Sequence, residues 1–214
     1  MTKKLKAYHK QLVKLDETRK RMESLYQSGH VILRDVHSVY ESLFLRAVVG
    51  FEHFCEKLFF AIVEGKITYP STRLRCLLTG ARADEVLGIV LQRDNYLTWL
   101  PYKNAEERAK LFMFAKGPKK ANGRPFLDLT TGEKSQLATI CTIRNAIAHI
   151  SDYSIEKFTK TVIGNQSIPP SERKPASFLR SQIAGSPPAT RFEIYISNLG
   201  SIAQNIEGVP EGEQ

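Results

Sequence analysis

Three polar side chains interrupt an apolar stretch near residue 145, and their types suit chemistry on a phosphate group. The stretch reads Ile143-Arg144-Asn145-Ala146-Ile147-Ala148-His149. A helix turns about 100° per residue, so Asn145 and His149 share one face, and the Asn145 amide could orient the imidazole. Arginine presents a planar fork of donors to phosphate oxygens, and histidine gains or loses a proton near neutral pH. These residues predict a site that binds phosphate and transfers protons.

A second interpretation of the same residues involves no chemistry. Arg144 and His149 lie about 140° apart around the helix axis, and near a helix end both can donate to neighbouring carbonyl groups. Burial of such polar groups costs free energy unless they are paired or face a cleft. The residues alone leave both interpretations open.

Other patterns that carry chemistry are weak in this chain. There is no glycine-rich phosphate loop, no Gly-x-Ser-x-Gly elbow and no His-Glu-x-x-His pair. Cys55, Cys76 and Cys141 are far apart in apolar surroundings, which is typical of reduced packing cysteines. No Cys-x-x-Cys pair and no histidine pair with ligand spacing is present, so we expect neither a metal nor another cofactor.

The basic charge of the chain is concentrated in two stretches. The 214 residues include 31 Lys and Arg against 22 Asp and Glu, a formal charge of +9. Residues 1–21 and 103–124 are the basic stretches, whereas the tail from Phe192 onward carries only acidic charges. Clustered basic charge favours a polyanionic partner, because each neutralised phosphate releases counterions. A solvated lysine-rich surface is equally compatible with this pattern.

Hydrophobic periodicity predicts an all-α fold with one long central helix. Its apolar face is so wide that we expect burial against several partners or at a dimer interface. Capping boxes are predicted at Thr130–Glu133 and Thr190–Glu193, although a strand at 192–197 is the competing interpretation for the second. The expected helices cover residues 3–27, 31–64, 72–78, 84–93, 104–116, 130–150 and 190–206.

The chain divides into four predicted regions. Residues 1–28 form a basic amphipathic N-terminal helix, and 30–163 form the helical domain. A Pro/Ser-rich stretch, 164–189, reads as an extended connector, and 190–214 hold a C-terminal helix and an acidic tail. No apolar run is long enough to span a membrane and the N-terminus has no secretory pattern, so we expect a cytoplasmic protein without membrane contact.

The run Arg-Asn-Ala-Ile-Ala-His, preceded by the aromatic-rich helix LFLRAVVGFEHFCEKLFF, resembles the Arg-x4-His signature of the HEPN superfamily (higher eukaryotes and prokaryotes nucleotide-binding). The resemblance covers about residues 30–160, and the long helix is similar to the RiboL-PSP-type branch. It implies a HEPN-like helical bundle with N- and C-terminal helical appendages. It also implies a homodimer in which both motif copies meet in one cleft. The branch paired with nucleotidyltransferase antitoxins has a tyrosine two residues past the histidine. This chain has Ser151 there and so departs from the pattern of that branch.

Many members of that family are metal-independent endoribonucleases of toxin–antitoxin, anti-phage and RNA-processing systems. The resemblance therefore implies cleavage of RNA by its own 2′-OH, leaving 2′,3′-cyclic phosphate and 5′-OH ends. The partners it implies are RNA, a second copy of the chain, and an antitoxin or defence-system protein. A non-catalytic HEPN-like module that binds nucleic acid or a partner protein is the alternative.

The resemblance and the charge pattern assign roles to individual residues. Glu52 on the long helix is a candidate accessory residue near the cleft; a surface charge paired with Lys57 or His53 is the other interpretation. The expected catalytic residues are Arg144, Asn145 and His149, and the expected RNA-binding residues are Lys116, Lys119, Lys120 and Arg124.

Overall fold

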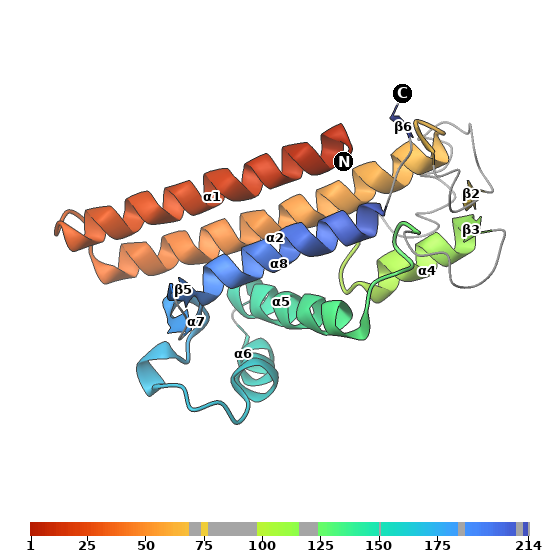
Figure 1. The fold of residues 1–214 in the computed structure, drawn as a ribbon. Coiled ribbons are helices and arrows are strands. Elements are labelled where there is room, and N and C mark those ends of the chain that lie inside the picture. Colours follow the sequence, from red (N-terminus) through yellow and green to blue (C-terminus); the bar gives the residue numbers. More distant parts are fainter. Residues whose placement is uncertain are drawn as a thin grey trace. The chain divides into compact units, whose positions relative to one another are not determined.

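Apolar side chains spaced three and four residues apart become the buried faces of long helices, and the predicted all-α fold is confirmed (Figure 1). The computed structural model describes residues 1–68, 74–76, 98–115, 124–149, 151–183, 187–208 and 212–213. Their α-helices are α1 (Lys3–Gln27), α2 (Leu33–Val63), α4 (Lys103–Phe112), α5 (Thr131–His149), α6 (Asp152–Phe158), α7 (Pro175–Arg180) and α8 (Arg191–Glu207).

Glycines set the ends of the two longest helices. Gly29 follows α1 with φ of +75°, and Gly65 follows α2 with φ of +73°. Glycine adopts this left-handed conformation without a steric penalty, which is why it commonly terminates helices. Both helices therefore end where the sequence predicts.

The chain forms two compact units, each assembled from separate stretches. Unit 1 contains Met1–Tyr8, Phe51–Lys134 and Ser201–Gln214, and unit 2 contains His9–Gly50 and Ser135–Gly200. The continuous regions predicted from composition do not anticipate this division, because α1, α2, α5 and α8 each contribute residues to both units.

Within unit 2, α1, α2 and α8 lie side by side (Figure 1). Helices α1 and α2 approach closely at Gly50, where a Cβ would lie only 2.7 Å from Nε2 of Gln11. The Tyr40 ring meets Phe192 edge to face with centroids 5.5 Å apart. These contacts join the three helices around an apolar and aromatic core.

Unit 1 has an aromatic core of its own. The Phe59 ring lies 5.4 Å from Trp99, which stacks 6.0 Å from Phe126. The Tyr102 hydroxyl donates to the Phe126 carbonyl at 2.6 Å. Trp99 is only 1% exposed, so it lies in the centre of this core.

The segment predicted as an extended connector is partly helical. Residues 170–172 form a 3-10 turn, and Pro175 then opens α7, in which Ala176, Phe178 and Leu179 are buried. Arg180 at the end of α7 binds Glu23 of α1 at 2.8 and 3.0 Å. The prediction failed because apolar side chains among the prolines find partners elsewhere in unit 2, such as Phe158, whose ring lies 5.5 Å from Phe178.

Short strands replace two predicted helical stretches. Residues 74–76, expected to be helical, form β2, and residues 113–115, expected to extend α4, form β3; Cys76 pairs with Met113. A strand needs a distant partner, which local periodicity does not reveal. The predicted helix 84–93 lies outside the described residues. The short strands are β1 (Ile67–Thr68), β2 (Leu74–Cys76), β3 (Met113–Ala115), β4 (Gln182–Ile183), β5 (Ala189–Thr190) and β6 (Gly212–Glu213), and they pair antiparallel as β1–β6, β2–β3 and β4–β5.

None of the helices in the described part of the chain has the length and apolarity needed to cross a membrane. Neither Cys55 nor Cys141 forms a disulfide with another described residue; Cys55 is buried, as expected of a packing cysteine, and Cys141 is half-buried.

Candidate active site

Helix α5 carries the Arg-Asn-x3-His motif, and its predicted capping box is present at its start. The Glu133 carboxylate accepts from the backbone N–H and the hydroxyl of Thr130, both at 2.7 Å. The Thr130 hydroxyl oxygen accepts in turn from the Glu133 backbone N–H at 3.2 Å. Two backbone donors at the helix terminus are thereby satisfied, so the capping box determines where α5 begins.

One stripe of α5 is buried and leaves the motif on the other side. The buried side chains are Leu137, Ile140, Ile143, Ala146 and Ile147. Arg144 and Asn145 are half-buried, and His149 in the last turn is exposed. The apolar stripe therefore orients the helix so that the motif residues reach the surface of unit 2.

Asn145 binds Arg144 rather than His149. Nη1 of Arg144 donates to Oδ1 of Asn145 at 2.9 Å, and the Asn145 amide lies 3.9 Å from the sulfur of Cys141. The prediction that Asn145 orients the imidazole is therefore wrong for this structure. The i, i+4 spacing allows that contact, but the adjacent guanidinium is the stronger donor for the amide oxygen.

The Arg144 guanidinium has no carboxylate partner among the described residues. Its bond to Asn145 is to a neutral amide, whereas Arg19, Arg124 and Arg180 each bind an acidic side chain. An arginine stays charged at every physiological pH. Arg144 therefore keeps its positive charge and its remaining donors for an anion that approaches α5.

His149 is exposed at the end of α5 and makes no hydrogen bond to another described residue. The chain then enters α6 through a second cap, in which the Ser151 oxygen accepts from the Ser154 N–H at 3.3 Å. Both serine hydroxyls belong to that cap, since they bind each other at 3.0 Å. The imidazole is thus the proton-transfer group left free at this junction.

Tyr153 is a surface residue of this region to which the sequence analysis gave no role. It lies in the first turn of α6, four residues past His149, and 74% of its side chain is exposed. Exposed aromatic rings of this kind can stack on nucleic-acid bases. Local polarity around Ser151 and Asp152 could have indicated its exposure.

Glu52 belongs to unit 1, whereas the motif belongs to unit 2. Its carboxylate accepts from the Leu100 backbone N–H at 3.4 Å. His53 pairs with Glu56 at 3.6 Å instead of with Glu52. The accessory role of Glu52 stays a prediction.

The predicted RNA-binding residues are only partly within the structure. Lys116, Lys119 and Lys120 lie outside the described residues. Arg124 binds Asp128 through two nitrogens, at 2.9 and 2.7 Å, and its backbone N–H also donates to that carboxylate at 2.6 Å. An RNA phosphate would compete with Asp128 for this guanidinium.

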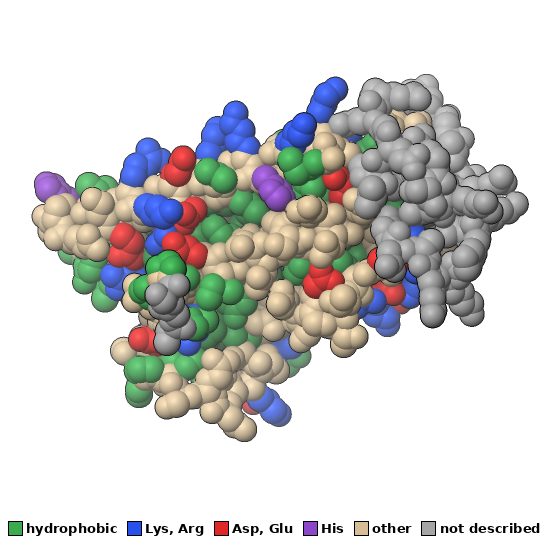
Figure 2. Space-filling model, in the orientation of Figure 1, with side chains coloured by type: hydrophobic (Ala, Val, Ile, Leu, Met, Phe, Trp, Pro, Cys, Tyr) green, Lys and Arg blue, Asp and Glu red, His purple; other side chains and the backbone are tan. Residues whose placement is uncertain are grey.

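The N-terminal basic stretch is less available than its composition indicates. Basic side chains gather along α1 (Figure 2). However, Arg19 is only 5% exposed and binds Asp16 at 2.8 Å, and Lys20 binds the same carboxylate at 2.7 Å. These two cations are therefore paired with an acidic side chain of α1 rather than free to bind a polyanion.

No group of three or more His, Cys, Asp or Glu side chains in the described ranges is arranged to hold a metal ion. Comparison of the chain with protein-family models, with curated proteins and with solved structures finds no match.

Proposed function

We propose that this protein is an endoribonuclease of the HEPN type, acting in the cytoplasm without a metal ion as a toxin or anti-phage effector. The observation that carries the proposal is on α5. Arg144 binds no carboxylate among the described residues, and it lies five positions before His149, which is exposed. Phosphate binding and proton transfer are the two functions that RNA cleavage requires from a protein.

The proposed reaction uses the nucleophile that RNA itself carries. The 2′-oxygen attacks the adjacent phosphorus, the P–O2′ bond forms, and the P–O5′ bond breaks. One imidazole accepts the proton from the 2′-OH, and an imidazolium donates a proton to the departing 5′-oxygen. The products are a 2′,3′-cyclic phosphate and a 5′-OH end. Because RNA supplies the nucleophile, the step requires no metal-bound water.

Arg144 and Asn145 have distinct roles in this proposal. The guanidinium stabilises the extra negative charge of the phosphorane, in the manner of an oxyanion hole. Asn145 is a positioning residue, because its amide oxygen holds Nη1 of Arg144 at 2.9 Å. An amide does so without neutralising the guanidinium, as a carboxylate would.

A single α5 carries one imidazole at its motif, yet the reaction needs both a proton acceptor and a proton donor. A two-fold axis beside His149 would bring a second copy of the motif into the same cleft, because an isologous interface repeats each residue. We therefore propose that the active form is a homodimer. We also propose that an antitoxin or another defence-system protein is a partner of this chain.

The decisive experiment is cleavage of a fluorescently labelled mixed-sequence RNA by purified protein, with and without a chelator. We expect cleavage in both conditions and cyclic-phosphate ends. His149→Ala should abolish cleavage, while His30→Ala, at an exposed histidine of the α1–α2 turn, should leave it unchanged. Light scattering on the same samples should show a dimer.

The outcomes separate the proposal from its alternative. RNA that is bound with a salt-dependent affinity but never cut would identify a non-catalytic binding module. Cleavage that His149→Ala leaves intact, or that a chelator stops and magnesium restores, would refute the proposed mechanism. Full activity of a monomer would refute the dimer.

A further inference from the structure

The outward face of α1 in unit 2 carries a row of basic side chains. Lys10, Lys14 and Arg21 are exposed, and a turn of about 100° per residue places them within an arc of about 40° around the helix axis. At a rise of about 1.5 Å per residue, the row spans about 16 Å along that axis. Figure 2 shows Lys and Arg side chains along the outer edge of α1. The helix therefore holds these charges in a straight row.

Helix α2 adds a fourth cation to this surface. Arg46 is exposed, and its backbone carbonyl accepts from Nε2 of Gln11 on α1 at 3.2 Å. Residues three apart on a helix are neighbours, so the α2 backbone at Arg46 passes close to the turn of α1 that carries Lys14. Arg46 lies outside both basic stretches of the sequence, and only the fold brings it beside them.

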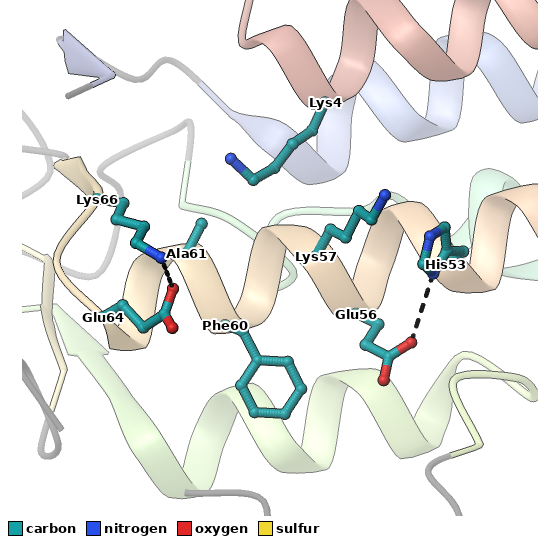
Figure 3. Close-up of a pocket in the computed structure, with 8 residues that line it drawn as sticks. All are labelled: Lys4, His53, Glu56, Lys57, Phe60, Ala61, Glu64 and Lys66. Atoms are coloured by element: carbon teal, nitrogen blue, oxygen red, sulfur yellow. Dashed lines mark ion pairs between the residues drawn. The ribbon is translucent and has the colours of Figure 1, made fainter. Parts of the chain in front are cut away.

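None of these four cations forms an ion pair with another described residue. The Arg21 guanidinium donates to a neutral group, the Thr18 hydroxyl, at 3.3 Å. By contrast, Lys66 just past the end of α2 pairs with Glu64 at 2.7 Å (Figure 3). The cations of the α1 row therefore keep their charge for a partner.

One exposed acid, Glu17, lies among these cations on α1. The other two acids of α1 are half-buried and paired, since Asp16 binds Arg19 and Glu23 binds Arg180, both at 2.8 Å. Four cations against one exposed carboxylate leave the surface positive. Such a surface attracts a partner with closely spaced negative charges.

An anionic membrane is a poor match for this surface. A helix that lies on a membrane inserts its apolar face into the lipid, but Leu12 and Leu15 on the apolar face of α1 are buried in the protein. Val13 and Leu25 are the exposed large hydrophobic residues of α1, and they lie about three turns apart. The helix therefore has no continuous apolar surface to insert.

The backbone of a nucleic-acid duplex matches it better. B-DNA carries about one negative charge per 1.7 Å of duplex axis, so many phosphates would pass along the row. Surfaces that bind single strands add aromatic rings on which bases stack. No exposed side chain among the described residues of α1 is aromatic. The surface offers contacts to phosphates and none to bases.

We propose that Lys10, Lys14 and Arg21 of α1, together with Arg46 of α2, bind the phosphate backbone of a nucleic-acid duplex without reading its sequence. Contacts to phosphates position a duplex and carry no sequence information. None of these residues belongs to the α5 motif, and the binding does not depend on the proposed cleavage. RNA and DNA duplexes share this backbone chemistry, so both should bind.

The test is fluorescence anisotropy of labelled DNA and RNA duplexes of several sequences, titrated with the full-length protein at a series of salt concentrations. The DNA duplex lacks the 2′-OH that the proposed cleavage requires, so its binding is measured without turnover. Lys14→Gln should weaken binding of every duplex about fivefold or more and reduce the slope of log affinity against log salt by about 0.9. A preference for RNA or for DNA identifies which duplex is the partner.

Two further variants separate direct contact from overall charge. Lys20→Gln removes the same charge from α1, but Lys20 is paired with Asp16 at 2.7 Å, so it should weaken binding much less than Lys14→Gln does. Glu17→Gln removes the acid of this surface and should strengthen binding. Circular dichroism checks that each variant folds.

Three results would overturn the proposal. The first is that neither duplex binds. The second is that Lys10→Gln, Lys14→Gln and Arg46→Gln all bind duplexes as the unmodified protein does; RNA cleavage would then leave the proposed function standing without this surface. The third is binding to vesicles that contain phosphatidylserine but not to duplexes, which would identify a membrane as the partner.

Discussion

The Arg19 guanidinium on α1 binds the Glu193 carboxylate on α8 at 2.5 Å, within unit 2. Glu193 uses its other oxygen for the α8 capping box, where it accepts from the N–H and the hydroxyl of Thr190 at 2.8 Å. Glu133 has the same arrangement in unit 1: one oxygen caps α5 and the other accepts from the Asn205 amide. Each of these glutamates therefore caps the N-terminus of one helix and binds a side chain of another helix.

Replacement of Arg19 should destabilise the protein. Arg19→Ala removes the cation that Asp16 and Glu193 share, although Lys20 still pairs with Asp16, and losing a hydrogen bond to a charged group costs about 1.5–3 kcal/mol. Urea unfolding followed by circular dichroism measures this loss. Arg21→Ala, at an exposed neighbour on α1, should change the free energy of unfolding by less than about 0.5 kcal/mol. Equal unfolding midpoints for the two variants would contradict this role of Arg19.

Loss of either capping threonine should lower the free energy of unfolding by less than loss of Arg19 does. Thr130→Ala and Thr190→Ala each remove the hydroxyl of a capping box, and such losses cost about 0.5–2 kcal/mol. Thr139→Ala is the control, because its hydroxyl binds a carbonyl within α5 and caps nothing. Thermal unfolding that ranks Thr139→Ala as the most damaging variant would show that the caps are unimportant.

Stability should fall in acid through Glu23. Burial by itself raises the pKa of Glu23, but the hydrogen bonds from Arg180 and Tyr40 outweigh it and hold the pKa below its usual value. A carboxylate with a lowered folded-state pKa stabilises the fold above its ordinary pKa, and this stabilisation is lost as the pH falls through the folded-state pKa.

The measurement is urea unfolding of Glu23→Gln and of the unmodified protein between about pH 6 and pH 3. The variant should be less stable at pH 6, and the difference should shrink toward pH 3. Glu17→Gln, at an exposed position on α1, should follow the unmodified protein. A constant difference across the whole range would exclude the linkage.

Asn145→Asp is a sharp test of the charge on Arg144. The substituted carboxylate would keep the 2.9 Å contact but neutralise the guanidinium, so RNA cleavage should fall more than in Asn145→Ala. We expect a loss of at least about a hundredfold, comparable to removal of one oxyanion donor. Single-turnover cleavage rates give the comparison. If Asn145→Asp were as active as the unmodified protein, the free charge of Arg144 would have no part in the reaction.

Tyr153 should contribute to RNA binding by stacking. Tyr153→Ala should weaken binding of single-stranded RNA by about 1–3 kcal/mol, the usual range for one stacked base. Tyr153→Phe keeps the ring and should bind nearly as well as the unmodified protein. Fluorescence anisotropy at fixed salt measures both affinities. A loss in Tyr153→Phe equal to that in Tyr153→Ala would assign the effect to the hydroxyl instead.

Local signals were sufficient to predict the long helices and their caps. The ends of α1 and α2 depend on Gly29 and Gly65, and the starts of α5 and α8 depend on threonine–glutamate pairs three residues apart. All of these interactions join residues within one turn of each other. The placement of Arg144, Asn145 and His149 on one helix follows from the same short-range order.

Contacts between distant residues could not be predicted in this way. The Pro-rich composition of 164–189 did not predict α7. Helix α7 depends on distant residues, because Phe178 packs against Phe158 and Arg180 binds Glu23. Strand β2 needs β3, which lies far along the chain. Arg19 joins α1 to α8 through Glu193, which lies 174 residues further along the chain and which local periodicity could not identify as its partner.

The candidate site likewise depends partly on short-range order and partly on contacts that only the fold creates. Residue types and spacing determined which side chains α5 carries and the kind of chemistry they suit. Only the tertiary structure decided that Asn145 binds Arg144 and that His149 is left without a partner among the described residues. The physical reason is that a hydrogen bond forms only between a donor and an acceptor about 3 Å apart. The folding of the whole chain determines which donors and acceptors come that close to each side chain.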